Sequence, residues 1–194
     1  MSTTLRRAFC FLISLAVLSS IASCDFGGND GNNTPDTLIP LTEGNRWVAE
    51  VSGGATDSVT TEVVGDSVRV KKHQGGIVVI LDVLLSEQSD GFLLRGAGLS
   101  NVMLLKFPVE DGSTYEHTDA NGNTYQVSVS RTSASVPVGN FENCLEYTVR
   151  GTENGTLRAI LTVKPGFGPV QWSSDIFPIT DQRPAELTST NVNR

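Results

Sequence analysis

Short apolar runs separated by turn residues dominate the chain from position 46 onward. Val, Ile, Thr and aromatic residues are frequent in these runs, and amphipathic patterns of helical length are absent. We therefore predict an all-β domain, a single antiparallel meander, because parallel strand pairs would need long crossover connections. The pattern is compatible with a curved sheet, a half-barrel or a sandwich. The predicted strands cover residues 46–52, 57–64, 67–73, 76–86, 91–96, 101–107, 113–118, 123–131, 144–152, 156–164 and 169–173.

Two Asn-Gly pairs, Asn121-Gly122 and Asn154-Gly155, lie between alternating runs and predict type I′ hairpin turns, in which both central residues take positive φ. Along 144–150 the apolar residues fall on one parity and the polar residues on the other. This alternation predicts a sheet with one solvated face.

The run GIVVILDVLLS, residues 76–86, departs from this alternation because apolar residues occupy both parities. One interpretation is a central strand covered on both faces by another layer, a loop or a short helix. The alternative is that one face binds an apolar ligand, and the neighbouring run NVMLLKF is open to the same two interpretations. The candidate ligand face comprises Ile77, Val79, Leu81, Val83, Met103 and Leu105.

The first residues have the three-part pattern of a secretory signal peptide. Arg6 and Arg7 precede the apolar run AFCFLISLAVL, and small residues follow it. The apolar run is shorter than the about 20 residues that a membrane-spanning helix needs. We predict that residues 1–23 are removed.

The last four positions of this pattern read I-A-S-C, from Ile21 to Cys24. They resemble the lipobox of bacterial lipoproteins, in which a branched apolar residue and two small residues precede an obligatory Cys. The resemblance implies cleavage after Ser23 and lipidation of Cys24. It also implies that the chain is held at a membrane through the lipids on Cys24, since two or more acyl chains give stable anchoring.

Composition divides the remaining chain into three parts. Residues 24–36 are nearly all Gly, Asn, Asp and Pro and are predicted to form a flexible tether. Residues 37–183 carry the predicted β-domain. Residues 184–194 are mostly polar, and we predict a poorly ordered tail there.

The net charge narrows the classes of possible partners, and the cysteine content bears on how the fold is stabilised. Without residues 1–23 the chain has twelve Lys and Arg against 21 Asp and Glu, a net charge of −9. This acidity argues against nucleic acid and anionic lipid surfaces as partners. Cys144 is the thiol that remains beyond Cys24, so the fold is expected to stand without a disulfide, and Cys144 is expected to be a small buried residue.

Motifs that carry chemistry are missing from the sequence. It contains no G-x-S-x-G, no H-E-x-x-H and no phosphate-binding loop. His73 and His117 are both expected near strand ends, and the segment Asp119 to Asn123 is expected to be a turn rather than a calcium loop. We therefore expect no catalytic residue, no metal and no cofactor.

Two later stretches, SVPVGNFENCLEYTV and VKPGFGPVQWSS, resemble a recurring element of uncharacterised bacterial envelope lipoproteins. In those proteins a V-P-x-G-x-F turn opens a long strand, and a P-G-x-G-x-V turn leads to the last strand of the domain. The resemblance implies a curved antiparallel sheet or half-barrel, and it carries no activity.

Three functions are compatible with these features. The favoured one is a lipid-anchored, non-enzymatic envelope protein whose β-domain binds a partner or acts as a scaffold. The second is a carrier or sensor of an apolar ligand, such as a lipid, on the concave face of the sheet. The third is an envelope hydrolase with a site outside known motifs. The domain would lie in the periplasm or at the cell surface, and the sequence is compatible with either membrane.

Overall fold

The computed structural model describes residues 35–54, 56–96, 99–119, 121–153 and 155–193, with the side chains of residues 96 and 99–104 excepted. Twelve strands were found in this part of the chain. They are β1 Arg46–Val51, β2 Ser58–Val64, β3 Ser67–Gln74, β4 Ile77–Gln88, β5 Gly91–Gly96, β6 Leu99–Lys106, β7 Thr114–Thr118, β8 Thr124–Val136, β9 Gly139–Gly151, β10 Leu157–Lys164, β11 Gly168–Ser174 and β12 Ala185–Thr190.

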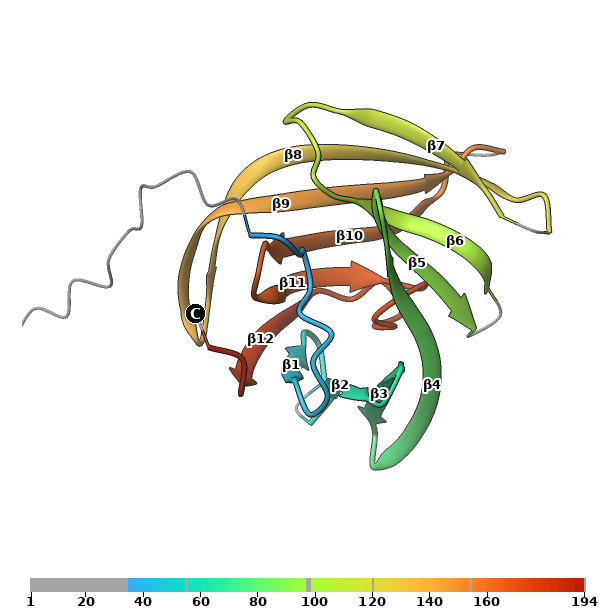
Figure 1. The fold of residues 1–194 in the computed structure, drawn as a ribbon. Coiled ribbons are helices and arrows are strands. Elements are labelled where there is room, and N and C mark those ends of the chain that lie inside the picture. The colour runs from blue at the N-terminus through green and yellow to red at the C-terminus, as the bar shows by residue number, and fades with distance from the viewer. Residues whose placement is uncertain (1–34, 55, 97–98, 120, 154, 194) are drawn as a thin grey trace, which may run out of the picture. The chain divides into compact units, whose positions relative to one another are not determined.

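The strands form one antiparallel sheet in the order β6-β5-β4-β3-β2-β1-β12-β11-β10-β9-β8-β7 (Figure 1). Consecutive strands pair with each other, except β6 and β7, which lie at the two edges of the sheet. The pairing of β1 with β12 joins the first and last strands of the chain. The predicted all-β antiparallel fold is confirmed. No helix with the length and apolar character of a membrane span occurs in the described part of the chain.

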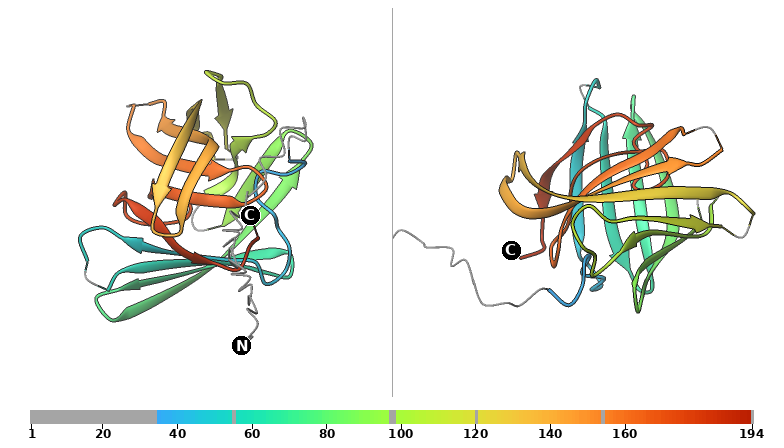
Figure 2. Two further views of the ribbon diagram at one scale, coloured as in Figure 1. Left: turned by 90° about the vertical axis from the view of Figure 1, so that its left-hand side faces the viewer. Right: turned by 90° about the horizontal axis from the view of Figure 1, so that it is seen from above.

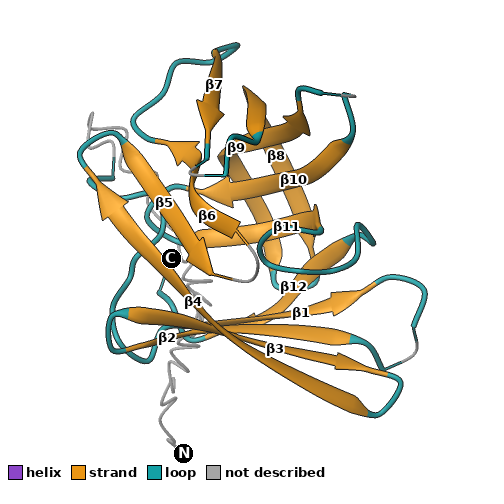
Figure 3. Cartoon of the chain, turned by 90° about the vertical axis from the view of Figure 1, so that its right-hand side faces the viewer, coloured by secondary structure: helices purple, strands orange, loops and turns teal. Residues whose placement is uncertain are grey.

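The sheet is strongly curled, so that β1 to β4 face β8 to β10 across a common interior (Figures 2 and 3). Two tyrosines hold its edge strands near each other. The Tyr147 hydroxyl on β9 donates to the Lys106 carbonyl oxygen at 2.8 Å, and the Lys106 amide donates to the Tyr115 hydroxyl on β7 at 3.0 Å. Burial raises the pKa of both tyrosines, so they stay protonated at ordinary pH.

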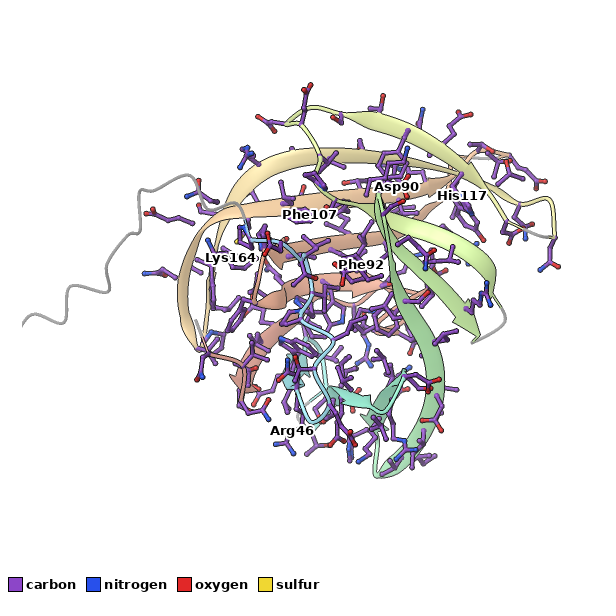
Figure 4. The ribbon with its side chains drawn as sticks, viewed as in Figure 1. Arg46, Asp90, Phe92, Phe107, His117 and Lys164 are labelled. Carbon is purple, nitrogen blue, oxygen red and sulfur yellow. The ribbon has the colours of Figure 1, made fainter. Side chains whose placement is uncertain are left out.

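Alternating apolar residues from both halves fill the interior, with Trp47, Trp172, Tyr147 and Phe92 among the largest fully buried side chains. The Trp47 Nε1–H donates to the Phe167 carbonyl oxygen at 2.9 Å and so links β1 to the turn before β11. Figure 4 places Phe92 within the curl and Arg46 at its periphery.

The segment that precedes β1 is part of the core rather than a linker. Leu38 is fully buried and Ile39 nearly so. The Gly166 amide donates to the Thr37 carbonyl oxygen at 2.9 Å, which ties this segment to the turn between β10 and β11.

The prediction of a poorly ordered tail from residue 184 is wrong for residues 185–190, which form β12. This strand pairs with β1 and β11 and buries Ala185 and Leu187 on alternate positions. Only these two positions of the strand are apolar, so the local sequence resembles a polar tail. Their burial depends on pairing with β1, a strand about 140 positions earlier in the chain.

The remaining strand predictions agree with β1 to β11, with one difference in length. Strands β8 and β9 continue past the predicted ends at residues 131 and 144 and meet at the turn between Val136 and Gly139. The V-P-x-G turn therefore opens the long strand β9, and the P-G-x-G turn leads into β11, as the resemblance implied. However, β11 is followed by β12 and is not the last strand.

The turn at Asn121-Gly122 is not of type I′, since Gly122 has positive φ and Asn121 does not. The Asp119 carboxylate organises a longer loop instead. It accepts hydrogen bonds from the amides of Asn121 and Asn123 at 2.9 and 2.8 Å. The second predicted pair includes Asn154, which lies outside the described residues.

Candidate functional site

Four consecutive apolar side chains are exposed at the start of β4. Ile77, Val78, Val79 and Ile80 are 67%, 51%, 44% and 57% exposed. In a strand, consecutive side chains point to opposite faces, so this segment is bare on both faces of the sheet. Exposed apolar patches of this kind are typical of interaction sites in soluble domains.

A tight turn places this segment at the tip of the β3–β4 hairpin. Gly75 and Gly76, with φ of 54° and 81°, connect Gln74 to its register partner Ile77. Both glycines need the left-handed region because a two-residue turn of type I′ has positive φ at both positions. The hairpin therefore starts with a defined register.

The same segment lacks a strand on its second edge. Strand β4 pairs with β3 from Ile77 to Val83 but with β5 only from Leu84 onward. Figure 3 shows β4 running from the tip shared with β3 to the side of β5. Within the described residues, no strand pairs with the second edge of residues 77–83.

The register decides which backbone groups face this edge. In a two-residue hairpin the flanking pair, here Gln74 and Ile77, exchanges both hydrogen bonds. Odd-numbered residues of this segment therefore bond to β3. The N–H and C=O groups of Val78, Ile80 and Asp82 point outward. We call residues 77–83 with these outward groups the free edge of β4.

Ion pairs neutralise the charges beside the free edge on the outer face. Arg69 Nε lies 2.7 Å from Asp82 Oδ1, and Lys71 Nζ lies 3.5 Å from Glu62 Oε2. The hydrogen bond from Arg69 lowers the pKa of Asp82, so that this carboxylate stays ionised. The cations of β3 therefore offer little attraction for an acidic ligand.

On the inner face, the connection between β11 and β12 contacts Lys72 of β3 and Asp57, while Ile77 and Val79 of β4 stay exposed. Lys72 forms an ion pair with Asp181 of this connection, and Arg183 Nη1 lies 2.7 Å from Asp57 Oδ2. The Asp57 carboxylate also accepts from the Gly75 amide at 3.2 Å. The bond from Arg183 and the one from Gly75 lower the pKa of Asp57. These contacts hold the tip of the hairpin in place.

The residues predicted as a ligand face are spread over different environments. Ile77 and Val79 are exposed and Leu81 is half-buried, whereas Val83 and Leu105 are core residues, 1% and 3% exposed. The side chain of Met103 lies outside the described part of the chain. An apolar cavity lined by Ile39, Leu41, Trp47, Thr61, Val68, Leu85, Pro169 and Phe177 has a volume of about 10 Å³, roughly the room for one water molecule.

Sequence reasoning singled out the run at 76–86 but not its exposure. Both interpretations of the run placed a covering element or a ligand over it, while residues 77–80 are open to solvent on both faces. The candidate ligand face predicted from sequence did not include Val78 and Ile80, because only the odd-numbered residues of this run were assigned to that face. The signal for this exposed tip was the run of apolar residues at both odd and even positions directly after the turn Gly75-Gly76.

Among the other candidates for chemistry, His73 borders this site, and the others lie apart from it. His73 is half-buried opposite Val78, and His117 lies on β7, at the other end of the strand order. Cys144 is fully buried, which raises the pKa of its thiol. In the described ranges, no three His, Cys, Asp or Glu residues gather as a possible metal site. Ser23 and Cys24 lie outside the described residues.

Comparison with known proteins adds little. No protein-family model and no curated protein matches the chain. A crystal structure of a proposed lipoprotein from Parabacteroides distasonis is similar over 80% of this chain and 98% of its own, with 14% identity and a TM-score of 0.42. This likeness is too low to carry a conclusion about the chain.

Proposed function

We propose that the chain is a lipid-anchored protein of the cell envelope that has no enzymatic activity and binds an extended segment of a partner at the free edge of β4. The resemblance of I-A-S-C to a lipobox supports the anchor, and the predicted tether at 24–36 would separate the anchor from the domain. The proposal includes no catalytic residue and no cofactor.

The free edge is the observation that carries the binding role. Natural proteins shield edge strands with charges, prolines, bulges or covering elements, because a bare apolar edge recruits other strands. Residues 77–80 carry none of these devices. An added strand would satisfy the outward backbone groups of Val78, Ile80 and Asp82 and would cover the flanks of the exposed side chains. Fully burying one Val or Ile side chain contributes about 1.5–3 kcal/mol.

Insertion of the hairpin tip into a bilayer would cover the same side chains, but it is disfavoured by the backbone. Unpaired N–H and C=O groups cost several kcal/mol each in hydrocarbon, and open sheet edges do not occur there. A strand supplied by a protein removes this cost. The free edge therefore favours a protein partner over lipid.

The carrier alternative has less support from the geometry. A lipid-sized ligand needs a mostly apolar pocket of several hundred Å³. The apolar cavity beside Trp47 has a volume of about 10 Å³. A hollow of about 360 Å³ next to β1 and β12 is lined mainly by polar residues, such as Arg46, Glu62 and Thr190. Ile77 and Val79 lie outside the apolar cavity, and Val83 is packed in the core.

Photo-crosslinking tests the binding role in cells that produce the full chain. A photoreactive amino acid at position 80 is expected to give covalent adducts of higher mass. The same group at Ser128, an exposed position of β8 that is paired on both sides, is the matched control and is expected to give none. Adducts that are absent at position 80, or equally abundant at both positions, would reject the free edge as a binding site.

A further inference from the structure

We propose that the partner at the free edge of β4 is a second copy of the same chain, joined through antiparallel pairing of the two β4 strands. This inference rests on the proposed function, because it uses the same edge. It would join two twelve-stranded sheets across a two-fold axis, the commonest symmetry of soluble homo-oligomers.

The register of this pairing follows from the outward backbone groups. Only Val78, Ile80 and Asp82 can bond across the edge, so they must oppose outward residues of the second copy. A two-fold axis at Ile80 uses the whole unpaired segment 77–83. It places Ile80 opposite Ile80, and Val79 opposite Leu81, of the second copy. Ile80 would then meet Ile80 on the outer face and Val79 would meet Leu81 on the inner face, while Val78 would lie opposite Asp82.

The edge is self-complementary because it is apolar and locally neutral. Its nearest cations are already paired within one copy: Arg69 with Asp82, Lys71 with Glu62 and Lys72 with Asp181. A charged peptide would find no excess charge to bind. Two copies repel through their net charge of −9 each, but screening limits this repulsion to about 8 Å at physiological ionic strength.

Anchoring would favour this pairing. Seven residues of strand pairing form a small interface compared with the about 1,200–2,000 Å² that stable complexes bury. We therefore expect weak association in dilute solution. The twelve residues from Cys24 to Pro35 span at most about 40 Å, which keeps each copy near the membrane and raises the effective concentration of the other.

Disulfide trapping in the membranes of producing cells tests the pairing and its register. At the axis, the Cα atoms of a hydrogen-bonded pair lie about 5.5 Å apart, within the range for a disulfide. Ile80→Cys is therefore expected to give a covalent dimer under mild oxidation. Val78→Cys, on the same face and similarly exposed, is the matched control. Its two thiols would lie four residues apart along the joined strands, about 14 Å, and it is expected to stay monomeric.

The native thiols do not interfere, because Cys144 is fully buried and Cys24 would carry its lipid through sulfur. Equal dimer yields for the two variants, or a dimer of Val78→Cys alone, would overturn the pairing. No dimer from Ile80→Cys, together with photo-adducts from position 80 to a different protein, would reject the second copy and leave the proposed function standing. An absence of both disulfide dimers and photo-adducts would reject both.

Discussion

Trp47→Ala is expected to lower the free energy of unfolding of the β-domain by about 3–5 kcal/mol, the range for removing a large buried aromatic side chain. Trp47 is 1% exposed and lines the small cavity beneath Ile39 and Leu41. Its indole ring also packs against Gly168, where an added Cβ would lie 2.8 Å from ring atoms. The substitution would therefore loosen the segment before β1 as well as β1 itself.

Urea unfolding followed by the fluorescence of Trp172 measures this loss. Trp47→Phe is the control, since it keeps most of the apolar volume and removes the hydrogen bond from Nε1–H to the Phe167 carbonyl oxygen. We expect it to cost less than Trp47→Ala, because one hydrogen bond contributes about 1 kcal/mol net. A loss below about 1 kcal/mol for Trp47→Ala would contradict the placement of this residue at the centre of the core.

Cys24→Ser is expected to move the protein from the membrane fraction to the soluble fraction. Serine lacks the thiol that accepts the lipid, and stable anchoring depends on the acyl chains because each buried CH₂ contributes about 0.8 kcal/mol. The variant should carry an ordinary secretory leader in place of residues 1–23, so that cleavage does not depend on the cysteine. Sedimentation and intact mass give the distribution and the processed form.

Cys144→Ser, made in the natural chain, is the control and is expected to sediment with membranes. A Cys24→Ser protein of the processed mass that still sediments would refute the lipid anchor. The same fractionation would then point to a membrane contact within the domain.

Much of the fold could be predicted from sequence because its determinants are local. Turn residues such as Gly75-Gly76 and Gly65 separate runs of β-branched residues, and each strand from β2 to β6 pairs with the preceding strand. Strand β12 could not be predicted in this way. Its two apolar residues are buried only when β12 pairs with β1. This pairing brings together opposite ends of the domain.

The candidate site could be predicted only in part. Apolar residues on both parities marked 76–86 as unusual, but the pattern does not say whether a neighbour covers the strand. Whether the strand is covered depends on where the pairing of β5 with β4 ends, at the pair of Leu84 with Arg95. Single-sequence patterns contain no signal for the length over which two strands stay paired.

Strand β7, at another edge of the sheet, is protected in ways that the free edge of β4 is not. Strand β7 is also an edge strand, but it is only five residues long and presents Glu116 and Thr118 to solvent. Short length and polar side chains are common ways to protect an edge. Residues 77–83 are longer and apolar up to Asp82, so this edge lacks the protection that β7 has.

Amide hydrogen exchange of residues 77–83 tests the central claim, that the free edge of β4 is a binding site, most directly. The measurement compares the anchored protein in its membranes with the same protein dispersed as monomers in mild detergent. Our account predicts that the amides of Val78, Ile80 and Asp82 exchange rapidly in the monomer and become protected in the membrane, while the odd-numbered amides bonded to β3 change little. Equally rapid exchange of these three amides in both states would contradict it.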